Sequence, residues 1–598
     1  MSLASHNPSR AGVTLMCGIA GVLGTADGAL IERMTAAIHH RGPDGRGHAS
    51  RGTSHIGATR LGIIDPAASP QPIYNETEEI CLVFNGEIYN HRELRAELES
   101  KGHRFRTRTD TEVVVHLYEE MGDDCVRRLH GMFAFAILDG ARLFLARDRL
   151  GIKPLHYVLL PETQTFLFAS EVKSILQHPG FTPRLNLQAL ADSIVLGYPL
   201  GDETYFDGVR SLFPGHTMVV SCGDRLRVEE PRRYYALDFT RQESMSFDEA
   251  ERQLEAELER AVDTHLAADV EVGLTLSGGL DSTVLALFAS ERLARPILSF
   301  TVGDHEGYAD VVQAGHVAEM VGSEHERIIV GFDDYLAAIP DLVAAEERPS
   351  SLHGMAFYLL CQRVAQRVKA CLHGEGADEI FGGYRDYVSR ESRLAVIRER
   401  LPILKRLGVP PSVYALETIE SLASAATFED YLPRIFKVNM ADALERQHLA
   451  PVDRYAMAAS LEMRVPYLDD GVVELAGRIP LPFLVRYDIS VRKYILRRLT
   501  LRRFGPRTID VVLREKLGAP IASIHLLDRF DRLCEETLPD DYLAKHEFGY
   551  CFGAKRELLL FEMFIEMFMK HRGDPGSIGS VMEFLQDRSG ASSARRAR

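Results

Sequence analysis

Hydrophobic residues follow two different patterns along this chain, which indicates two differently built parts. From Cys17 to about Leu226, short apolar or alternating runs are bounded by glycine, aspartate and asparagine, as strands and turns are. Apolar residues three and four positions apart predict helices at 91–102 and 111–122. We therefore predict an α+β first domain over residues 17–226. Its predicted strands lie at 17–24, 54–65, 79–90, 131–139 and 141–148.

A charged, irregular stretch from 228 to 246 separates this part from a second pattern, in which strands and helices alternate. Such alternation predicts an α/β fold with a doubly wound parallel sheet, whose ligands bind at the carboxyl ends of the strands. After about Glu391 the chain is mainly helical, so we expect a second domain over 247–570 with a helical C-terminal part. The small, basic end at 585–598 is typical of a disordered tail. Predicted strands lie at 271–276, 296–303, 326–330 and 369–373, and predicted helices at 248–266, 282–293, 309–322 and 357–368.

Composition narrows the class of protein. The chain has 598 residues, of which 46% are hydrophobic and 26% charged, as in ordinary multidomain globular proteins. A net charge of -16 argues against a general binder of nucleic acid or of anionic membranes. No apolar run approaches the roughly 20 residues of a membrane-spanning helix, and the N-terminus lacks a signal-peptide core. None of the eight cysteines forms a CxxC pair, so we expect neither a zinc site nor a disulfide framework, but a reduced, cytoplasmic protein.

The strongest local motif is SGGLDS, which lies between an apolar strand and a helix. Small consecutive residues let backbone N–H groups approach a phosphate chain, and the N-terminus of the helix adds positive potential. Asp281 is placed to hold a Mg²⁺ ion that neutralises the phosphates. The alternative is a glycine-rich turn that merely opens a helix. We expect the whole loop to bind ATP phosphates; its residues are Ser277, Gly278, Gly279, Leu280, Asp281 and Ser282.

This loop resembles the pyrophosphate-binding loop of N-type ATP pyrophosphatases, and it lacks the GK[ST] of a Walker loop. The resemblance implies cleavage of ATP between its α and β phosphates and an acyl-adenylate intermediate. SGGLDS alone does not choose among synthetases that make amides, nucleotides or modified tRNA.

Three motifs in the first part resemble the class II glutamine amidotransferases: CGIAG from Cys17, HRGPDG from His40 and NGEIYN from Asn85. The resemblance implies a four-layer αββα Ntn-hydrolase fold. It also implies that the Cys17 thiolate attacks the amide of glutamine, while the α-amine of the same residue acts as general base. Each residue alone has an ordinary reading, such as a buried free cysteine or an Asn-Gly turn. Their order and spacing together favour the amidotransferase.

The resemblance also assigns the glutamine pocket. The Asn85 side chain and the Gly86 N–H would form the oxyanion hole. Arg60 would bind the α-carboxylate of glutamine through its guanidinium fork. Glu87 and Asp110 would bind the α-ammonium; as isolated residues, Arg60 and Asp110 could equally be surface charges. The adjoining segment completes the expected pocket with Leu61, Gly62, Ile63 and Ile64.

Motifs in the second part resemble the glutamine-hydrolysing asparagine synthetases: HGEGADEIFGGY from His373, DRYAMA through LEMRVPYLD from Asp453, and REKLG from Arg514. The resemblance runs from Cys17 to about Leu526. It implies that Leu276 and Val302 flank the adenine and that His373 and Gly374 touch the nucleotide. Other implied roles are adenylate formation or ammonia deprotonation for Glu375, metal binding with Asp281 for Asp378, and charge neutralisation for Lys516. The alternative for Glu375 and Asp378 is a carboxylate pair at a helix N-terminus. The alternative for Lys516 is a surface salt bridge.

The sequence departs from this family in four places. Gly62 replaces the usual serine after Arg60-Leu61, a minor change for substrate contacts. Residues 1–16 precede Cys17, although the mechanism needs a free α-amine there; a misassigned start, with translation from Met16, is the interpretation we favour over proteolytic processing or a blocked glutaminase. His373 replaces the usual serine. The segment from Glu347 to Phe357, which should line the pocket for the acid, also differs, and both changes bear on which acid is activated.

We therefore predict amide synthesis from ATP, glutamine and a carboxylic acid, with Mg²⁺ as cofactor and aspartate as the default acid. Ammonia would cross a shielded tunnel between the two sites, and the segment from Ala146 to Leu155 would help to couple them. Amidation of another acid is the first alternative, followed by lactam or peptide cyclisation and then by a regulatory homologue without activity. The expected partners are small molecules and a second copy of the chain in a homodimer, with no nucleic acid and no membrane.

Overall fold

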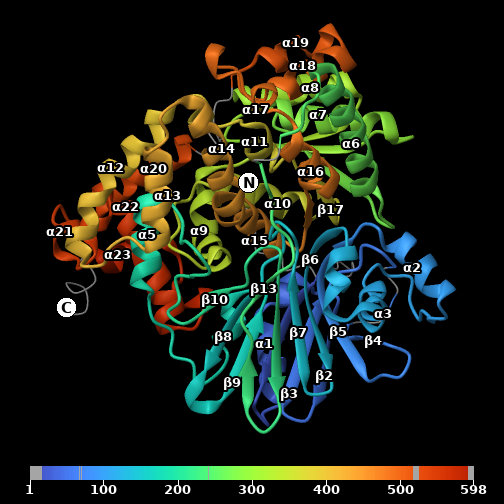
Figure 1. The fold of residues 1–598 in the computed structure, drawn as a ribbon. Coiled ribbons are helices and arrows are strands. Elements are labelled where there is room, and N and C mark those ends of the chain that lie inside the picture. The colour runs from blue at the N-terminus through green and yellow to red at the C-terminus, as the bar shows by residue number, and fades with distance from the viewer. Residues whose placement is uncertain (1–16, 66–67, 69–70, 240–241, 516–523, 590–598) are drawn as a thin grey trace, which may run out of the picture.

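The computed structural model describes residues 17–65, 68, 71–239, 242–515 and 524–589. Across these residues the strands form two antiparallel sheets in the N-terminal part and one parallel sheet in the C-terminal part. Figure 1 shows the strand-rich N-terminal part below and the mainly helical C-terminal part above it. Lys516, the segment 1–16 and residues 590–598 of the expected tail 585–598 lie outside the described residues. Residues 585–588 of that tail are not disordered as expected, because they form the end of the helix α23 (Val581–Arg588).

The first antiparallel sheet carries the residue after Cys17 on one of its inner strands. Strands are ordered β10-β8-β9-β1-β3-β2. Their bounds are β10 Arg210–Ser211, β8 His156–Leu160, β9 Thr165–Ala169, β1 Gly18–Leu23, β3 Ser54–Arg60 and β2 Gly45–Arg51. The second sheet is ordered β12-β11-β7-β6-β5-β4, and β13 (Arg232–Arg233) pairs with β11. Its bounds are β12 Leu226–Val228, β11 His216–Cys222, β7 Arg142–Arg147, β6 Gly131–Asp139, β5 Ile80–Ile88 and β4 Ile73–Tyr74.

These two sheets pack face to face and are covered by helices on their outer faces. Ile19 and Ile56 of the first sheet share a buried cluster with Val83 and Ala136 of the second. The outer face of the second sheet packs on α2 (His91–Ser100) and α3 (Glu112–Met121). The outer face of the first sheet packs on α1 (Ala29–Ala37) and α4 (Val172–Ile175). The expected four-layer αββα fold is confirmed.

The parallel sheet is ordered β16-β15-β14-β17-β18. Its bounds are β14 Val272–Thr275, β15 Leu298–Gly303, β16 Glu324–Ile329, β17 Ala370–Leu372 and β18 Glu462–Arg464. The strand order reverses between β14 and β17, and ligands of doubly wound sheets bind at such a switch point. The loops after these two strands carry SGGLDS and HGEG, so the topology brings the two motifs together.

Helices surround the parallel sheet and continue to the C-terminus, which confirms the predicted α/β fold with a helical end. In chain order, the helices from α5 to α11 are α5 Leu187–Leu196, α6 Phe247–Leu266, α7 Leu280–Arg292, α8 Ala309–Val321, α9 Phe332–Glu346, α10 Met355–Val364 and α11 Ala377–Phe381. The later helices are α12 Arg390–Leu407, α13 Val413–Ala423, α14 Phe428–Val438, the π-helix η5 Asn439–Leu449, α15 Ala450–Ala458, α16 Asp470–Arg478, α17 Leu481–Leu484, α18 Tyr494–Phe504, α19 Ile509–Leu513, α20 Ile524–Thr537, α21 Tyr542–Lys545, α22 Lys555–Phe564 and α23 Val581–Arg588. In Figure 1 the last of these, in orange and red, lie beside α5 and α9.

Candidate functional site

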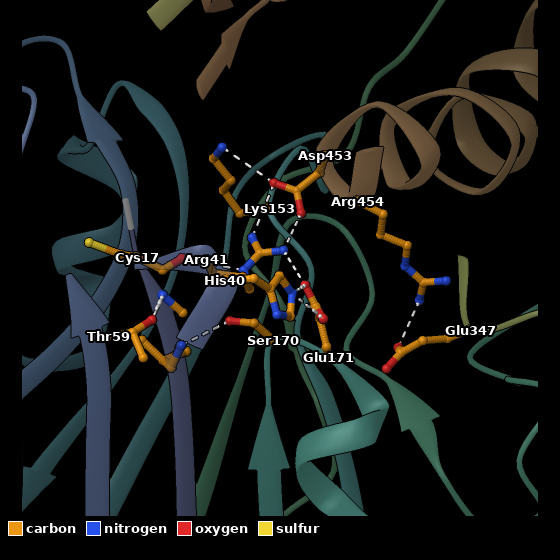
Figure 2. Close-up of polar contacts among 12 residues, drawn as sticks. Cys17, His40, Arg41, Thr59, Lys153, Ser170, Glu171, Glu347, Asp453 and Arg454 are labelled. Carbon is orange, nitrogen blue, oxygen red and sulfur yellow. Dashed lines mark hydrogen bonds and ion pairs between the residues drawn. The ribbon is translucent and has the colours of Figure 1, made fainter. Parts of the chain in front are cut away.

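Cys17 immediately precedes β1 and is held through its backbone. The N–H groups of the next two residues, Gly18 and Ile19, donate to the hydroxyls of Thr59 and Ser170, each at 3.0 Å. The Arg41 guanidinium donates to the carbonyl oxygen of Cys17 at 3.3 Å. Figure 2 shows these contacts on the strands behind the thiol. The nucleophile predicted from the sequence is therefore fixed at the end of a buried strand.

The thiol of Cys17 lies in a polar but buried environment. It donates to the carbonyl of Leu61, with the sulfur 3.9 Å from the oxygen, and the Gln71 amide approaches the sulfur at 3.5 Å. Burial raises the pKa of Cys17 to about 11. The thiol is protonated at neutral pH, so attack on a substrate needs a base within the site.

A single pocket surrounds this thiol and contains nearly all of the predicted glutamine-binding residues. Gly62 lies between two lining residues, Leu61 and Ile63. The side-chain oxygen and nitrogen of Asn85 are buried and have no hydrogen-bond partner among the described residues. Gly86 has φ +146°, and a Cβ there would overlap the Met132 carbonyl of β6. The lining residues are Cys17, Arg60, Leu61, Ile63, Ile64, Gln71, Asn85, Gly86, Glu87, Thr109, Asp110, Thr111 and Glu462.

The charges of this pocket suit a zwitterionic ligand. Burial, and then the neighbouring Asp110, raises the pKa of Glu87 well above its usual range. Burial likewise raises the pKa of Asp110, although its carboxylate accepts a hydrogen bond from the Ile88 N–H at 2.8 Å. Two buried carboxylates side by side favour binding of a cation. Arg60, the cation of the pocket, donates to the carbonyls of Ala68 and Asp65 at 2.9 and 2.8 Å.

The C-terminal part contributes to the same pocket, which sequence patterns did not predict. Glu462 of β18 is among the lining residues. Two positions later, the buried Arg464 donates to Glu87 at 3.1 Å and to Glu462 at 2.7 Å. The backbone carbonyl of Arg464 accepts a hydrogen bond from His373 N–H at 2.8 Å. One residue thus contacts both the predicted glutamine pocket and the predicted nucleotide loop.

A buried ion cluster, formed by Arg41, Lys153, Glu171 and Asp453, lies behind Cys17 at the junction of the two parts. Arg41 pairs with Glu171 and with Asp453 of α15, each at 2.8 Å, and Lys153 approaches Asp453 at 3.4 Å. Figure 2 shows Arg41 and Lys153 converging on Asp453. Breaking a buried pair of this kind typically costs about 3–5 kcal/mol because a charge is left uncompensated. The cluster ties the backbone of Cys17 to the C-terminal part.

The SGGLDS loop leads into α7, and hydrogen bonds of its own serine hydroxyl groups stabilise its conformation. Ser277 N–H donates to the Ser282 hydroxyl at 3.2 Å, and the two hydroxyls lie 3.1 Å apart. Gly278 has φ +68°, and a Cβ there would press on the backbone of α8 at 2.7 Å. Leu276 follows β14 and is buried, and Val302 lies on the adjacent strand β15. The predicted adenine and phosphate residues therefore surround one end of β14.

The HGEG loop adjoins this loop from β17. The Thr275 hydroxyl and the His373 Nδ1 lie 2.7 Å apart. A Cβ on Gly374 would lie 3.3 Å from the Cβ of Asp281, so the two loops approach as closely as glycine allows. The Phe357 ring packs against His373 in a tilted arrangement, with ring centroids 4.8 Å apart and planes at 37°. This contact brings the end of the divergent 347–357 segment to the nucleotide loop.

Lys493, rather than a residue of the predicted set, joins the two candidate metal ligands. Its ammonium group lies 2.5 Å from Asp281 and 2.6 Å from Asp378. The side chain is buried, and the two carboxylates outweigh burial and raise the pKa of Lys493. No short sequence motif links Lys493 to these aspartates, because it lies directly before α18, far along the chain from both of them. It contributes the kind of charge that we had expected from Lys516, which lies outside the described residues.

Glu375 lies in a second charged group with His448 and Glu379. His448 Nδ1 is 3.2 Å from Glu375, and His448 Nε2 is 3.4 Å from Glu379. Burial disfavours the imidazolium, but the two glutamates outweigh it and raise the pKa of His448 to about 9. Burial also opposes ionisation of Glu375, yet His373 and His448 lower its pKa well below the usual range. Glu375 is thus held as a carboxylate, which is a weak base.

Comparison with known proteins assigns a family to each of the two parts. Residues 16–235 match the family model of the glutamine amidotransferase domain, and residues 253–578 match that of asparagine synthase. The chain is 32% identical over 583 residues to a putative glutamine-hydrolysing asparagine synthetase of Mycobacterium tuberculosis, covering 86% of this chain and 87% of that protein. It is 31% identical to asparagine synthetase 3 of Bacillus subtilis, covering 78% of this chain and 81% of the relative. The chain belongs to the asparagine synthase family.

As a member of the asparagine synthase family, the protein is a ligase of the glutamine-hydrolysing asparagine synthase type, and it uses ATP and small-molecule substrates. Within the described part of the chain, none of the helices is long and apolar enough to cross a membrane. A small, mostly apolar cavity of the asparagine synthase-family protein adjoins the buried ion cluster, because Lys153 and Asp453 line it. It is lined by Ile152, Lys153, Leu449, Val452, Asp453, Ala456, Met457, Leu461, Met463 and Val465.

Proposed function

We propose that the protein forms asparagine from aspartate, with glutamine as nitrogen donor and ATP as the activating substrate. The observation that carries this proposal is the pairing of a thiol pocket with a nucleotide-loop site, both contacted by Arg464. The named relatives of this chain are asparagine synthetases, which favours aspartate among possible acids.

At the first site, the Cys17 thiol would attack the amide carbon of glutamine. The α-amine of a chain that begins at Cys17 would take the thiol proton and pass it to the departing nitrogen, so that ammonia leaves and a thioester remains. Asn85 supports this step because its unpartnered amide is available to the developing oxyanion. Water would then hydrolyse the thioester to glutamate. Arg60, Glu87 and Asp110 would hold the substrate by its α-carboxylate and α-ammonium.

At the second site, a carboxylate oxygen of aspartate would attack the α-phosphorus of ATP and displace pyrophosphate. Lys493 is placed to neutralise charge on the phosphates from between Asp281 and Asp378. These two carboxylates are the oxygen ligands that Mg²⁺ prefers, and Mg²⁺ bound there would supply charge neutralisation of the phosphates. Ammonia arriving through the apolar cavity would attack the acyl-adenylate and release AMP. Because Glu375 is a weak base, we assign it to stabilising the adenylation step rather than to deprotonating ammonium.

A second candidate acid is one other than aspartate, on the same machinery. His373 replaces the family's usual serine and is in contact with the ring of Phe357, which changes the surroundings of the acid. The domain limits 17–226 and 247–570, the homodimer and the cytoplasmic location also stand as proposals.

The test uses protein that begins at Cys17, supplied with ATP, Mg²⁺ and glutamine, with aspartate present or absent. Release of AMP and pyrophosphate that depends on aspartate, with asparagine formed, is the expected result. Hydrolysis of glutamine without that dependence would reject aspartate and keep the amidotransferase. Cys17→Ala should lose glutamine-driven synthesis and keep ammonia-driven synthesis, with Cys222→Ala as the matched cysteine control. Asp281→Ala should lose pyrophosphate release with either nitrogen donor; if it does not, the nucleotide site is wrongly placed.

A further inference from the structure

Two histidines and two glutamates come together in the N-terminal part, away from both sites described above. They come from three separate segments: the turn between β4 and β5, the loop after α2, and α3. In Figure 1 these elements lie at the outer edge of the N-terminal part. We call them the His2Glu2 cluster; its members are Glu76, His103, His116 and Glu119.

We propose that the His2Glu2 cluster binds one zinc ion. Imidazole nitrogens and carboxylate oxygens are common zinc ligands, and the sequence expectation of no zinc site rested on cysteine spacing alone. The cluster combines two ligands from one face of α3, at positions i and i+3, with one ligand from each of two neighbouring segments. Bound zinc would join the three segments.

The distances within the cluster match a tetrahedral site. Metal–ligand bonds of about 2.0–2.1 Å require ligand atoms about 3.3–3.4 Å apart. The Nδ1 of His116 lies 3.3 Å from a Glu76 oxygen and 3.2 Å from Glu119 Oε2. The Nδ1 of His103 lies 3.2 Å from the other Glu76 oxygen and 3.8 Å from the same Glu119 oxygen. One ligand atom from each of the four residues can be chosen so that all four lie within 4.8 Å of one another. Small side-chain adjustments bring all four ligand atoms around one ion.

One of the two histidines has the hydrogen-bonded outer carboxylate that zinc-bound imidazoles usually have. With Nδ1 facing the cluster, the other nitrogen of His103 bonds to Glu120 at 3.4 Å, whereas that of His116 faces Glu112 at 3.7 Å, beyond hydrogen-bond distance. Such carboxylates fix the tautomer and orientation of a ligating ring. The ligand glutamates are oriented too, because Glu119 accepts from Asn75 and Glu76 accepts from the Arg104 N–H, each at 2.8 Å.

The cluster connects to the glutamine pocket through Glu112. This carboxylate accepts hydrogen bonds from the N–H groups of Arg106 and Thr107, each at 2.7 Å, as well as facing His116. The chain then runs directly to Thr109, Asp110 and Thr111, which line the pocket. We infer that zinc braces the loop carrying Asp110; this consequence rests on the proposed glutamine site, whereas zinc binding itself does not.

The first measurement is the metal content of the full chain without any substrate. Protein freed of metal with a chelator should take up one equivalent of Zn²⁺, and Co²⁺ in its place should give the visible absorption of a tetrahedral site. His103→Ala should lose that equivalent. The matched control is His571→Ala, which removes a half-exposed histidine paired with Glu566 at 3.3 Å and should retain it. Because the synthetase site also offers carboxylates, uptake is read as the difference between each variant and the wild type.

A gentler variant guards against misfolding. Glu120→Gln keeps all four ligands and removes only the carboxylate that faces His103, so it should weaken Zn²⁺ binding by about 10–100-fold. Removal of zinc should also raise the KM for glutamine, and added Zn²⁺ should lower it again. Ammonia-driven synthesis, assayed with Mg²⁺ after the chelator has been removed, should be unchanged. Equal zinc uptake by the wild type and His103→Ala, or an unchanged affinity in Glu120→Gln, would overturn the proposal. Failure of amide synthesis alone would not, since metal content is measured independently of it.

Discussion

Asn85 is the residue whose environment most directly predicts its effect. Its buried amide has no partner among the described residues, although buried polar groups are normally hydrogen-bonded. We expect Asn85→Ala to lower kcat for glutamine hydrolysis by about 100–1,000-fold, because one donor to the oxyanion is lost. The KM for glutamine should change little, since Arg60, Glu87 and Asp110 remain. Steady-state release of glutamate measures both.

The internal control is ammonia-driven synthesis by the same Asn85→Ala protein, which should match the wild type. A loss of less than about tenfold in kcat would mean that Asn85 does not face the reacting carbonyl.

His448 should impose an alkaline limit on the synthetase site. Its pKa is about 9 in the folded protein against an ordinary 6.5, so the imidazolium stabilises the fold fully below 6.5. That stabilisation is lost as the pH rises through about 9, where the charge next to Glu375 disappears. Aspartate-dependent exchange between ATP and pyrophosphate, which needs no nitrogen donor, should fall over the same range. His448→Gln should be slower at neutral pH and should lack this alkaline fall; a profile that keeps it would assign it to another group.

In the turn after α11, the absence of a side chain at Gly383 should be needed for synthetase activity. Gly383 lies between the two halves of the ATP site, and a Cβ there would overlap the Asp378 carboxylate and the Lys493 side chain. We expect Gly383→Ala to lower pyrophosphate release by more than about tenfold, because misplacement of charged groups at a reacting centre is costly. Glutamine hydrolysis should persist, since that site lies on other elements.

The comparison variant for Gly383→Ala is Gly223→Ala, in the turn between β11 and β12, where a Cβ would meet nothing within 4 Å. That variant should behave as the wild type in both assays. Equal losses of both activities in Gly383→Ala would indicate general unfolding instead of a local effect.

At the level of elements, helices and strands with a clear hydrophobic period could be predicted from the sequence. A strand or side chain whose position depends on tertiary contacts could not. The strand–helix alternation around SGGLDS and the helices at 91–102 and 111–122 are present. Strand β18 was missed because Glu462-Met463-Arg464 reads as polar, whereas burial is possible there through pairing of Arg464 with Glu87 and Glu462. Lys493 was missed for a related reason: its position between Asp281 and Asp378 is set by the fold, and no local spacing marks it.

At the scale of the whole molecule, the two parts share buried structure. The C-terminal helices, whose sequence indicated no function, pack onto the N-terminal part. The ring centroid of Phe206 lies 5.7 Å from that of Phe564 and 5.6 Å from that of Phe568. Arg572 reaches the carbonyls of Leu176 and His178. Together with the buried ion cluster, these contacts hold the two sites in a fixed relation, which a passage for ammonia requires.

Arg464 is the residue through which the two sites should influence each other. Arg464→Lys keeps the buried charge but loses the guanidinium fork that pairs Glu87 with Glu462, so Glu87 is held less firmly. We expect the KM for glutamine to rise by about tenfold, equivalent to about 1.4 kcal/mol. We also expect ATP and aspartate to stimulate glutamine hydrolysis less in this variant than in the wild type. Ammonia-driven synthesis should persist, because the backbone contact to His373 does not depend on the side chain.

The matched control for Arg464→Lys is Arg478→Lys, an exposed arginine that lies 3.4 Å from Glu243 and should have no effect on either activity. Comparing glutamine hydrolysis with and without ATP and aspartate, in both variants, separates coupling from binding. If Arg464→Lys raises the KM but leaves the stimulation intact, Arg464 only shapes the glutamine pocket, and communication must run through the buried ion cluster around Arg41 and Asp453. If neither quantity changes, the contact between Arg464 and Glu87 has no part in catalysis.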